Sequence, residues 1–357
     1  MDVVDVIIVG AGLTGLSVAR NLELQGKDFL VLEARDRIGG RIHTVTTESG
    51  AMVEMGATWF FPPFKNLFKL LKELKVELME QYLKGYIMYE AGPDTPPKKS
   101  YSSGDDDDMF RIKGGTGKLI ETLFNALDTS KVRLGEIVTD IVDTGDGVEV
   151  VSNGKTYHSK RVVTTIPPQL LAFTLRFSPP LSDSTMAVLK ETHTWMGDSI
   201  KAAVTYSTPF WKEEGLSGAL YSNSGPFVQL YDQTSSDGKN AALVGFVEDS
   251  VADLTLVQRR DQIVAQLVRV FGDQAAQYLE YQETIWFQEK LTMGGPHNGP
   301  PPRVGRHKNN GHIVYQKPLY EGRLIIGGSE TSPQAGGYME GAVNSARHVS
   351  SLLKTTL

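Results

Sequence analysis

The sequence has no cysteine, and this absence excludes several kinds of chemistry. Without thiols the chain can form neither a disulfide nor a thiolate metal site. A flavin attached through a cysteinyl thioether is excluded for the same reason. Any cofactor must therefore be held by other contacts.

Long apolar runs and an excess of positive charge are also missing. No stretch approaches the roughly 18 consecutive apolar residues of a transmembrane helix, although 40% of the 357 residues are hydrophobic. The first predicted strand begins close to Met1, which leaves no room for a signal peptide. The net charge of −6 gives no excess of positive charge of the kind that binds nucleic acid. We expect a soluble, cytoplasmic protein that contacts neither membrane nor nucleic acid.

Motifs for metal binding and for nucleophilic catalysis are missing as well. The 7 histidines do not cluster at the spacing of metal ligands, so no metal site is predicted. No G-x-S-x-G nucleophile motif occurs in the chain. We therefore expect neither a metal site nor catalysis by a serine nucleophile of this type.

A glycine-rich turn near the start is the strongest motif that is present. A β-branched run, residues 5–9, is followed by Gly10-Ala11-Gly12-Leu13-Thr14-Gly15 and then by an apolar segment with helical periodicity. This order predicts the strand, tight turn and helix of a dinucleotide-binding unit. Gly10 permits the turn, Gly12 lets the backbone approach a pyrophosphate, and Gly15 allows close packing of helix on strand. The phosphates are expected at the positive end of the helix.

The next strand narrows the choice of cofactor. Residues 29–32 form a buried strand that ends at Glu33, at about the twenty-residue spacing of a carboxylate that binds a ribose hydroxyl. A carboxylate at this place disfavours a 2′-phosphate. Residues 34–41 then add two glycines flanked by arginines. Nicotinamide enzymes do not need this second turn. A flavin dinucleotide does, because the second turn contacts part of its pyrophosphate, so FAD is the predicted cofactor.

Two separated motifs resemble the flavin-containing amine oxidase family, which includes monoamine, polyamine and L-amino-acid oxidases. The first combines the turn at Gly10–Gly15 with the segment Val31–Arg41, which reads VLEARDRIGGR. The second comprises Ile325–Thr331 (IIGGSET) and Gly336–Ser345 (GGYMEGAVNS). Both occur in the order typical of the family.

This resemblance implies an α/β fold with two domains. A discontinuous, Rossmann-like FAD-binding domain is expected from residues 1–62, 112–180 and 290–357. An inserted α+β substrate-binding domain, built on a mixed sheet, is expected from residues 63–111 and 181–289.

The resemblance also implies which residues bind FAD, without a cysteinyl link. Glu330 is expected to bind the ribityl chain or pyrophosphate, the turn at Gly56 to approach the isoalloxazine ring, and Val138 to lie against the adenine. The predicted cofactor-binding residues are Gly10, Ala11, Gly12, Thr14, Gly15, Glu33, Ala34, Arg35, Gly40, Arg41, Gly56, Ala57, Thr58, Trp59, Val138, Glu330, Gly337, Tyr338, Met339 and Ala342.

Two residues are predicted to shape catalysis. An amine oxidase moves hydride from the carbon beside a neutral amine to flavin N5, and no acid–base pair is strictly required. The resemblance places Tyr338 as one wall of an aromatic cage that steers the amine, and His297 where the second aromatic usually stands. Molecular oxygen is the expected electron acceptor, with hydrogen peroxide as product.

A lysine that holds water beside N5 is common in the family, two residues ahead of a tryptophan. Matching that tryptophan to Trp286 puts Thr284 at this place, and Lys201 is a weaker alternative on another strand. Two further hypotheses therefore stay open. One is a carbon–carbon desaturase of the carotenoid or protoporphyrinogen type, and the other is a flavin-binding protein without amine turnover.

The remaining pattern predicts the elements between these motifs. Apolar residues at helical spacing indicate helices over 65–74, 257–271 and 338–353. Residues 282–287 alternate as a strand. Residues 91–108, rich in Pro, Ser, Gly and Asp, are expected to form a loop.

Overall fold

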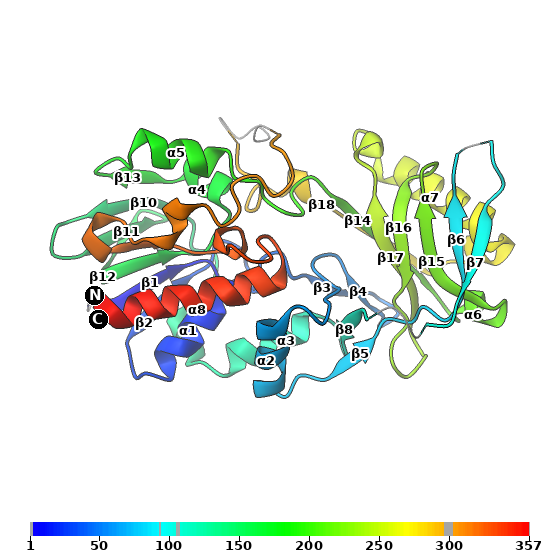
Figure 1. The fold of residues 1–357 in the computed structure, drawn as a ribbon, viewed down its shortest axis with the longest axis horizontal. Coiled ribbons are helices and arrows are strands. Elements are labelled where there is room, and N and C mark those ends of the chain that lie inside the picture. The colour runs from blue at the N-terminus through cyan, green and yellow to red at the C-terminus, as the bar shows by residue number, and fades with distance from the viewer. Residues whose placement is uncertain (1–2, 93, 105–107, 296–302, 357) are drawn as a thin grey trace.

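The computed structural model describes residues 3–92, 94–104, 108–295 and 303–356. Two large β-sheets occupy opposite ends of an elongated molecule, and both ends of the chain lie at the end that holds the first sheet (Figure 1). Segments far apart in the sequence meet in the first sheet.

The first sheet has eight strands in the order β13-β10-β11-β12-β1-β2-β9, with β19 paired to β12. β1 pairs in parallel with β2 and β12, and β12 pairs in parallel with β19. The four residues of β2 are all buried, as expected for an apolar strand covered on both faces. The strands are β1 (Val4–Val9), β2 (Phe29–Leu32), β9 (Val132–Arg133), β10 (Val138–Asp143), β11 (Val148–Ser152), β12 (Lys155–Thr164), β13 (Arg176–Ser178) and β19 (Leu324–Ile326).

Helices cover both faces of this sheet. Residues of α1, α2, α3 and α8 share one apolar core with β1 and β2, and residues of α4 and α5 share another with β10, β11 and β12. These helices are α1 (Leu13–Glu23), α2 (Lys65–Glu73), α3 (Gly117–Asn125), α4 (Pro168–Thr174), α5 (Asp183–Lys190) and α8 (Met339–Thr356). The βαβ unit predicted around the glycine turn is thus β1-α1-β2.

Helix α2 packs with the first sheet, although the sequence analysis assigned residues from 63 onward to the substrate domain. Leu67 and Leu71 lie in the same core as α1 and α8. The carboxylate of Glu340 accepts hydrogen bonds from the N–H groups of Asn66 and Leu67, at 3.1 and 2.7 Å. These otherwise unpaired N–H groups at the start of α2 hold the helix against α8.

The second sheet has seven strands in the order β18-β14-β17-β16-β15-β6-β7. It is mixed, because β6 pairs in parallel with β15 while the other pairs are antiparallel. Its strands are β6 (Gly85–Glu90), β7 (Lys98–Ser102), β14 (Ile200–Tyr206), β15 (Leu216–Ser222), β16 (Phe227–Asp232), β17 (Ala241–Val247) and β18 (Glu280–Ile285). The long helix α7 (Leu256–Phe271) buries its apolar side against this sheet, and the short helix α6 (Phe210–Glu213) packs beside β15. The α/β fold with a Rossmann-like part and a mixed-sheet part is therefore the one expected.

Two small antiparallel sheets of two strands each lie between the large sheets (Figure 1). They are β3 (Thr44–Thr46) with β4 (Met52–Glu54), and β5 (Leu78–Glu80) with β8 (Phe110–Ile112). Val53 and Met55 pack against Ala203 and Val244 of the second sheet. The β3-β4 pair thereby packs against the second sheet.

One secondary-structure prediction was wrong, and one predicted strand is present with different bounds. Residues 98–102, predicted as loop, form β7, whose exposed, lysine-containing sequence is typical of a protected edge strand. The strand predicted over 282–287 begins earlier, at Glu280, and ends at Ile285, where Trp286 starts a short 3₁₀ turn. In both places the pairing partner, rather than the local pattern, decides the boundary.

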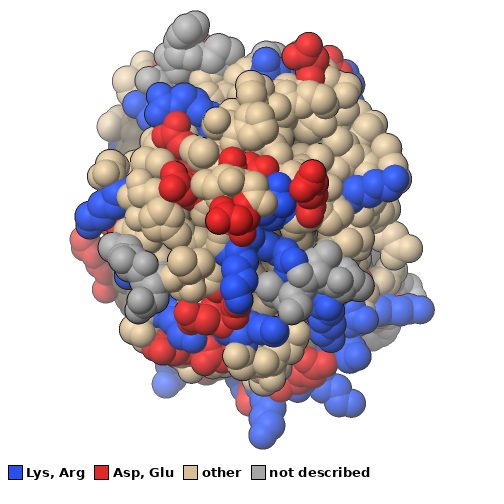
Figure 2. Space-filling model, turned by 90° about the vertical axis from the view of Figure 1, so that its left-hand side faces the viewer, with Lys and Arg blue, Asp and Glu red and all other residues tan. Residues whose placement is uncertain are grey.

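The surface carries both signs of charge. On the face shown in Figure 2, basic and acidic side chains are interspersed, as expected for a net charge of −6. Across the described residues, no helix combines the length and apolarity needed to cross a bilayer.

Replacing Leu267 with alanine should destabilise the protein markedly. Leu267 is fully buried between α7 and the second sheet, so the cavity left by L267A should lower the free energy of unfolding by about 2–5 kcal/mol. Leu256, in the same helix, is 51% exposed, and L256A serves as the control. Denaturant unfolding of both variants measures the difference, and equal losses would contradict this assignment of the core.

Candidate functional site

A cavity of about 710 Å³ lies where the two sheets meet. We call the part of the molecule built on the first sheet its first half and the part built on the second sheet its second half. The first half contributes the glycine turn and α8 to the cavity wall, and the second half contributes β14, β16 and β17. This volume falls within the range of about 300–1,000 Å³ typical of small-molecule sites.

The glycines of the first turn act as their spacing predicts. Gly10 has a φ of +107°, a conformation that favours glycine. A Cβ on Gly15 would lie 2.0 Å from the carbonyl oxygen of Gly10, so this position needs glycine for packing. A Cβ on Gly12 would meet nothing nearer than 3.9 Å, and Gly12 lines the cavity. Gly12 therefore leaves room for a ligand rather than for a neighbouring segment.

Glu33 presents a fixed carboxylate to the same cavity. The side chain is buried and accepts hydrogen bonds from the N–H groups of Ala11, at 2.8 Å, and Arg35, at 2.9 Å. Each carboxylate oxygen has capacity for a second donor. The residue can thus hold a diol such as that of a ribose, as its position after β2 predicts.

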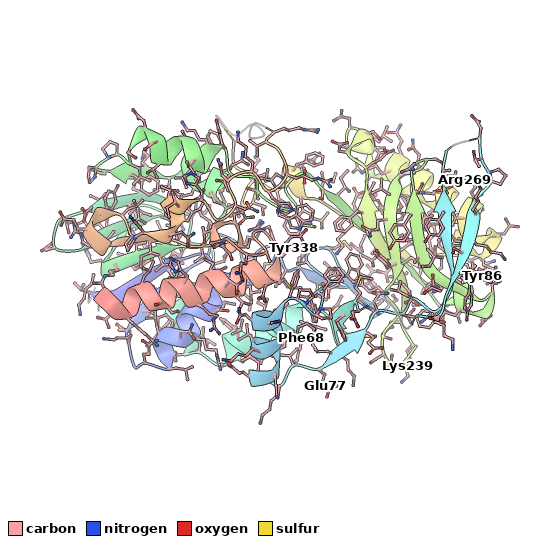
Figure 3. All side chains as sticks on the ribbon, in the orientation of Figure 1. Phe68, Glu77, Tyr86, Lys239, Arg269 and Tyr338 are labelled. Atoms are coloured by element: carbon pink, nitrogen blue, oxygen red, sulfur yellow. The ribbon has the colours of Figure 1, made fainter. Side chains whose placement is uncertain are left out.

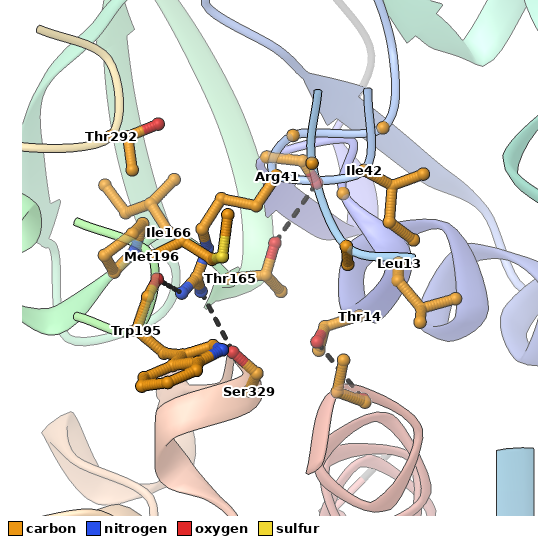
Figure 4. Close-up of a pocket in the computed structure, with 18 of the residues that line it drawn as sticks. Leu13, Thr14, Arg41, Ile42, Thr165, Ile166, Trp195, Met196, Thr292 and Ser329 are labelled. Atoms are coloured by element: carbon orange, nitrogen blue, oxygen red, sulfur yellow. Dashed lines mark hydrogen bonds between the residues drawn. The ribbon is translucent and has the colours of Figure 1, made fainter. Parts of the chain in front are cut away.

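Arg41, which lines the cavity, forms a bidentate ion pair with the fully buried Glu330. The two guanidinium nitrogens of Arg41 lie 2.5 and 2.8 Å from the two carboxylate oxygens of Glu330. Arg41 also donates to the Ser329 hydroxyl at 2.9 Å and to the Trp195 carbonyl at 2.8 Å (Figure 4). Burial alone would raise the pKa of Glu330, but the charge and hydrogen bonds of Arg41 outweigh burial and hold that pKa below its ordinary value.

The start of α8 forms another part of the wall. Gly337, Tyr338, Met339 and Ala342 all line the cavity, and the Thr14 hydroxyl donates to the Ala342 carbonyl at 3.1 Å. Tyr338 lies at the junction of the two halves of the molecule (Figure 3). The positive end of the α8 dipole therefore faces a site where negative charge is stabilised.

Tyr338 belongs to a group of aromatic rings. Its ring centroid lies 5.5 Å from those of Trp195 and His307 and 5.8 Å from that of Phe64. Trp195 also lines the cavity. The predicted second catalytic residue, His297, lies outside the described residues.

Most of the predicted cofactor-binding residues meet in this one cavity. Those that line it are Gly10, Gly12, Thr14, Glu33, Ala34, Arg35, Gly40, Arg41, Gly56, Ala57, Thr58, Trp59, Val138, Gly337, Tyr338, Met339 and Ala342. Ala11, Gly15 and Glu330 instead support the wall through the contacts described above.

Thr284, which the match to Trp286 puts at the place of the lysine, does not line this cavity. Thr284 pairs with Lys201 across β18 and β14, but it lines a separate, smaller cavity. Lys201 lines the main cavity and is fully buried. Lys201, the alternative on another strand, is thus the lysine in the wall of the main cavity.

Lys201 is held beside the turn at Gly56. Its ammonium donates to the Gly56 carbonyl at 2.5 Å and to the Thr58 hydroxyl. The nitrogen also lies 4.6 Å from the ring centroid of Trp59. Burial lowers the pKa of Lys201 to about 7, although the charge of Glu54 acts in the opposite direction.

Several cavity residues in the second half of the molecule were not predicted from the sequence. They come from β16, β17 and the segment before β14, and they are Trp195, Met196, Gln229, Tyr231 and Phe246. The sequence did contain one signal for this part of the cavity. Lys201 lies inside the buried strand Ile200–Tyr206, and a lysine is rarely buried without a specific role. The neighbouring aromatic residues gave no comparable local signal.

The described residues include no group of three or more histidine, aspartate or glutamate side chains arranged to hold a metal ion. The open backbone at Gly12, the fixed carboxylate of Glu33 and the length of the lined wall instead fit a dinucleotide.

A family model described as flavin containing amine oxidoreductase matches residues 13–87 and 89–353. The chain belongs to this family. Flavin-containing amine oxidase B of Sus scrofa is 25% identical over an alignment of 444 residues that covers 95% of this chain and 84% of the relative. The A form of the same species is 26% identical, with 95% and 83% covered. The protein is therefore a flavin-dependent amine oxidoreductase, and FAD is the cofactor that its family implies.

Solved structures of two amine oxidases share the fold of this amine oxidoreductase. Cyclohexylamine oxidase from Brevibacterium oxydans IH-35A superposes with a TM-score of 0.87 at 23% identity, covering 99% of each chain. Wild-type putrescine oxidase bound to putrescine superposes with a TM-score of 0.83 at 22% identity, covering 98% of each chain. The Rossmann-like part and the mixed-sheet part both have counterparts, which confirms the predicted fold class.

Replacing Gly15 with alanine should impair FAD retention. The added Cβ would lie 2.0 Å from the Gly10 carbonyl oxygen and 2.9 Å from the Thr165 hydroxyl, so the turn must open, at a cost of about 1–3 kcal/mol. We expect G15A to purify with less flavin per protein and to unfold at a lower temperature. Gly92 has open space around its Cβ position, and G92A should behave as the parent protein. Full flavin occupancy in G15A would contradict this reading of the turn.

Replacing Glu330 with glutamine should change how stability depends on pH. The pKa of Glu330 is below its ordinary value of 4.5 in the folded protein. Its contribution to stability is therefore present above pH 4.5 and is lost as the pH falls through the lower, folded-state pKa. Denaturant unfolding at a series of pH values should show lower stability for E330Q at neutral pH and a shallower decline in acid. The exposed Glu121 offers the control E121Q, and parallel acid profiles for E330Q and E121Q would refute the expectation.

Proposed function

We propose that this protein is an FAD-dependent oxidase of small amines, converting the amine to an imine with molecular oxygen as acceptor and hydrogen peroxide as product. The observation that carries the proposal is the meeting of Lys201 and Tyr338 in the wall of one cavity. These are the two residue types that the family resemblance links to the reacting centre. The electron balance closes, since the two electrons and two protons lost by the amine reduce one O₂ to H₂O₂.

FAD is proposed to bind non-covalently along the wall formed by the first sheet. The turn at Gly12 and the carboxylate of Glu33 suit its pyrophosphate and a ribose, respectively. The Arg41–Glu330 pair would hold the second glycine turn in place. Bound there, FAD supplies the two-electron acceptor for the amine's α-hydrogen.

The protein's own contribution is then to bind and orient the amine. Trp59, Phe246 and Tyr231 form an aromatic wall next to Lys201, with ring centroids of Trp59 and Tyr231 4.9 Å apart. Tyr338 adds a second flat surface. Such surfaces exclude water and favour an amine whose body is apolar. The near-neutral pKa of Lys201 limits its repulsion of a cationic substrate.

The hypothesis of a flavin-binding protein without turnover is now less well supported. That hypothesis rests on the lack of an assignable lysine and on a substrate entrance shorter than is usual in the family, and Lys201, which lines the cavity, answers the first of these two grounds. The desaturase alternative requires an apolar tunnel without the Tyr338 surface, and Tyr338 lines this cavity. The amine oxidase proposal is therefore the best supported of the three. The structural similarity to putrescine oxidase and cyclohexylamine oxidase agrees with an amine substrate.

An anaerobic substrate panel tests the proposal directly. The FAD-loaded protein is mixed with aromatic and alicyclic monoamines, diamines, polyamines and amino acids, and the flavin absorbance is followed. Bleaching by one or more amines, with peroxide formed when air is admitted, is the expected result. Bleaching by polyenes or porphyrinogens alone would favour the desaturase, and no bleaching by any compound would overturn the proposal.

Replacing Lys201 with methionine should slow flavin reduction without removing the flavin. Lys201 contacts the Gly56 turn and lines the cavity, so its loss should lower the anaerobic reduction rate by about 100-fold through misplacement of the reacting groups. Lys308, a surface lysine paired with Glu191, gives the control K308M. Stopped-flow absorbance measures both rates, and an unchanged rate in K201M would remove Lys201 from the reaction.

A further inference from the structure

One row of side chains crosses the second sheet from the cavity toward the surface. Residues that lie directly opposite each other on neighbouring strands point to the same face of a sheet. Lys201 of β14 pairs with Phe246 of β17, and Phe246 pairs with Gln229 of β16. All three residues line the cavity. The face of the sheet that carries this row is therefore the cavity face.

The same row continues beyond the cavity. Gln229 pairs with Tyr221 of β15, and Tyr221 pairs with Tyr89 of β6. Neither tyrosine is among the described residues that line the cavity. Lys98 of β7 pairs with Tyr89 and ends the row. Because β7 lies at the end of the sheet that is far from the first half of the molecule (Figure 1), the row leads outward.

Exposure increases along the row toward its outer end. Lys201 is fully buried, whereas Phe246 and Gln229 are partly buried. Tyr221 and Tyr89 are 37% and 38% exposed. The row thus connects the buried lysine with a pair of aromatic rings that solvent can reach.

Tyr89 and Tyr221 form what we call the outer tyrosine pair. Their ring centroids are 5.7 Å apart and their planes differ by 18°, so the rings are stacked. The hydroxyl of Tyr221 lies 2.9 Å from the hydroxyl of Tyr231, which lines the cavity. The side-chain amide of Gln229 also donates to the Tyr231 hydroxyl. These contacts hold Tyr221 in a fixed orientation next to the cavity wall.

The strand spacing gives the length of a ligand that would reach both ends of the row. Tyr221 is three strands away from Lys201, and Tyr89 is four strands away. Neighbouring strands lie about 4.8 Å apart, so the outer tyrosine pair lies roughly 14–19 Å from the lysine across the sheet. Benzylamine is too short to span this distance, whereas an amine with a long alkyl chain can do so.

The chemistry of the outer tyrosine pair favours an aromatic end group on such a chain. Exposed phenol rings bind a further aromatic ring by offset stacking or by edge-to-face contact. A second ammonium group is also attracted to a tyrosine ring. However, the exposed Lys98 is the next residue in the row, and its positive charge opposes a cation at this place.

We propose that Tyr89 and Tyr221 form an outer binding subsite for an aromatic group at the far end of a long-chain amine. The amino group of the same molecule lies near Lys201, and its chain lies along Gln229 and Phe246. The identity of the reactive end rests on the proposed function. The affinity of the outer tyrosine pair for an aromatic group can be measured without turnover.

Binding of unreactive analogues to the FAD-loaded protein tests the subsite. An amine whose α-carbon carries two methyl groups has no α-hydrogen to transfer, so it is not oxidised to an imine. Isothermal titration calorimetry gives the Kd of such analogues of benzylamine and of decylamine with a phenyl group at its far end. In Tyr89→Ala, the long analogue should be weakened about 10-fold more than the short one, because only the long one reaches the outer tyrosine pair.

Tyr86 provides a matched control in the same strand. It is 36% exposed, and its ring centroid lies 5.4 Å from that of Tyr101. It is three residues away from Tyr89 along β6 and therefore lies on the opposite face of the sheet. Y86A should leave the ratio of the two Kd values as it is in the parent protein. An unchanged ratio in Y89A, or the same change in Y86A, would overturn the proposal.

Two further measurements separate the ring contact from other effects. Y89F keeps the ring and should bind the long analogue as the parent protein does, and a loss as large as that in Y89A would contradict a ring contact. The unreactive diamine with the same chain carries a second ammonium in place of the phenyl group. It should bind more weakly than the phenyl analogue, and tighter binding of the diamine would refute an aromatic subsite.

Flavin reduction connects the subsite to the reaction. If decylamine with a phenyl end group reduces the flavin, the amine concentration that gives half the maximal rate should rise in Y89A by the same factor as the Kd of its analogue. An unchanged concentration would remove the outer tyrosine pair from substrate binding. If no amine reduces the flavin, the proposed function fails, while the Kd values still decide whether the outer subsite exists.

Discussion

The cavity depends on the ion pair between Arg41 and Glu330. These residues are 289 positions apart in the sequence, and Glu330 is fully buried. A buried carboxylate without its cation costs several kcal/mol, so the second glycine turn and the segment before α8 must close on each other. Ser329 and the Trp195 carbonyl complete the arginine's contacts. The two motifs from opposite ends of the chain thereby become one wall.

The second sheet brings the other wall through equally specific contacts. Lys201 binds the Gly56 carbonyl, and the indole N–H of Trp286 donates to the Met55 carbonyl at 2.7 Å. Both contacts end on the short segment after β4, so this segment is held between the sheets. Aromatic residues of the second sheet then face the glycine turns of the first across a single cavity. The wall of the cavity is thus shared by the two halves of the molecule.

Predictions succeeded where local chemistry allows one conformation. Gly10 needs a positive φ, Gly15 needs the absence of a Cβ, and Glu33 follows a buried strand at a fixed spacing. Predictions failed where a distant partner decides the outcome. The segment Lys98–Ser102 is polar, but it pairs with β6 as an edge strand. Thr284 and Lys201 are neighbours across two strands, and only the way the sheet packs shows which of them faces the cavity.

The class of cofactor that the family implies, the βαβ unit around the glycine turn and the lack of any cysteinyl attachment all follow from the sequence alone, because turns, strand periodicity and composition are local properties. Only the tertiary structure shows that Lys201 lines the cavity and that α2 packs with the first sheet. These depend on the side chains that become neighbours when water is excluded. Burial and the charge of a partner can shift the pKa of a side chain by several units. Neither can be deduced from the residues next to it in the sequence.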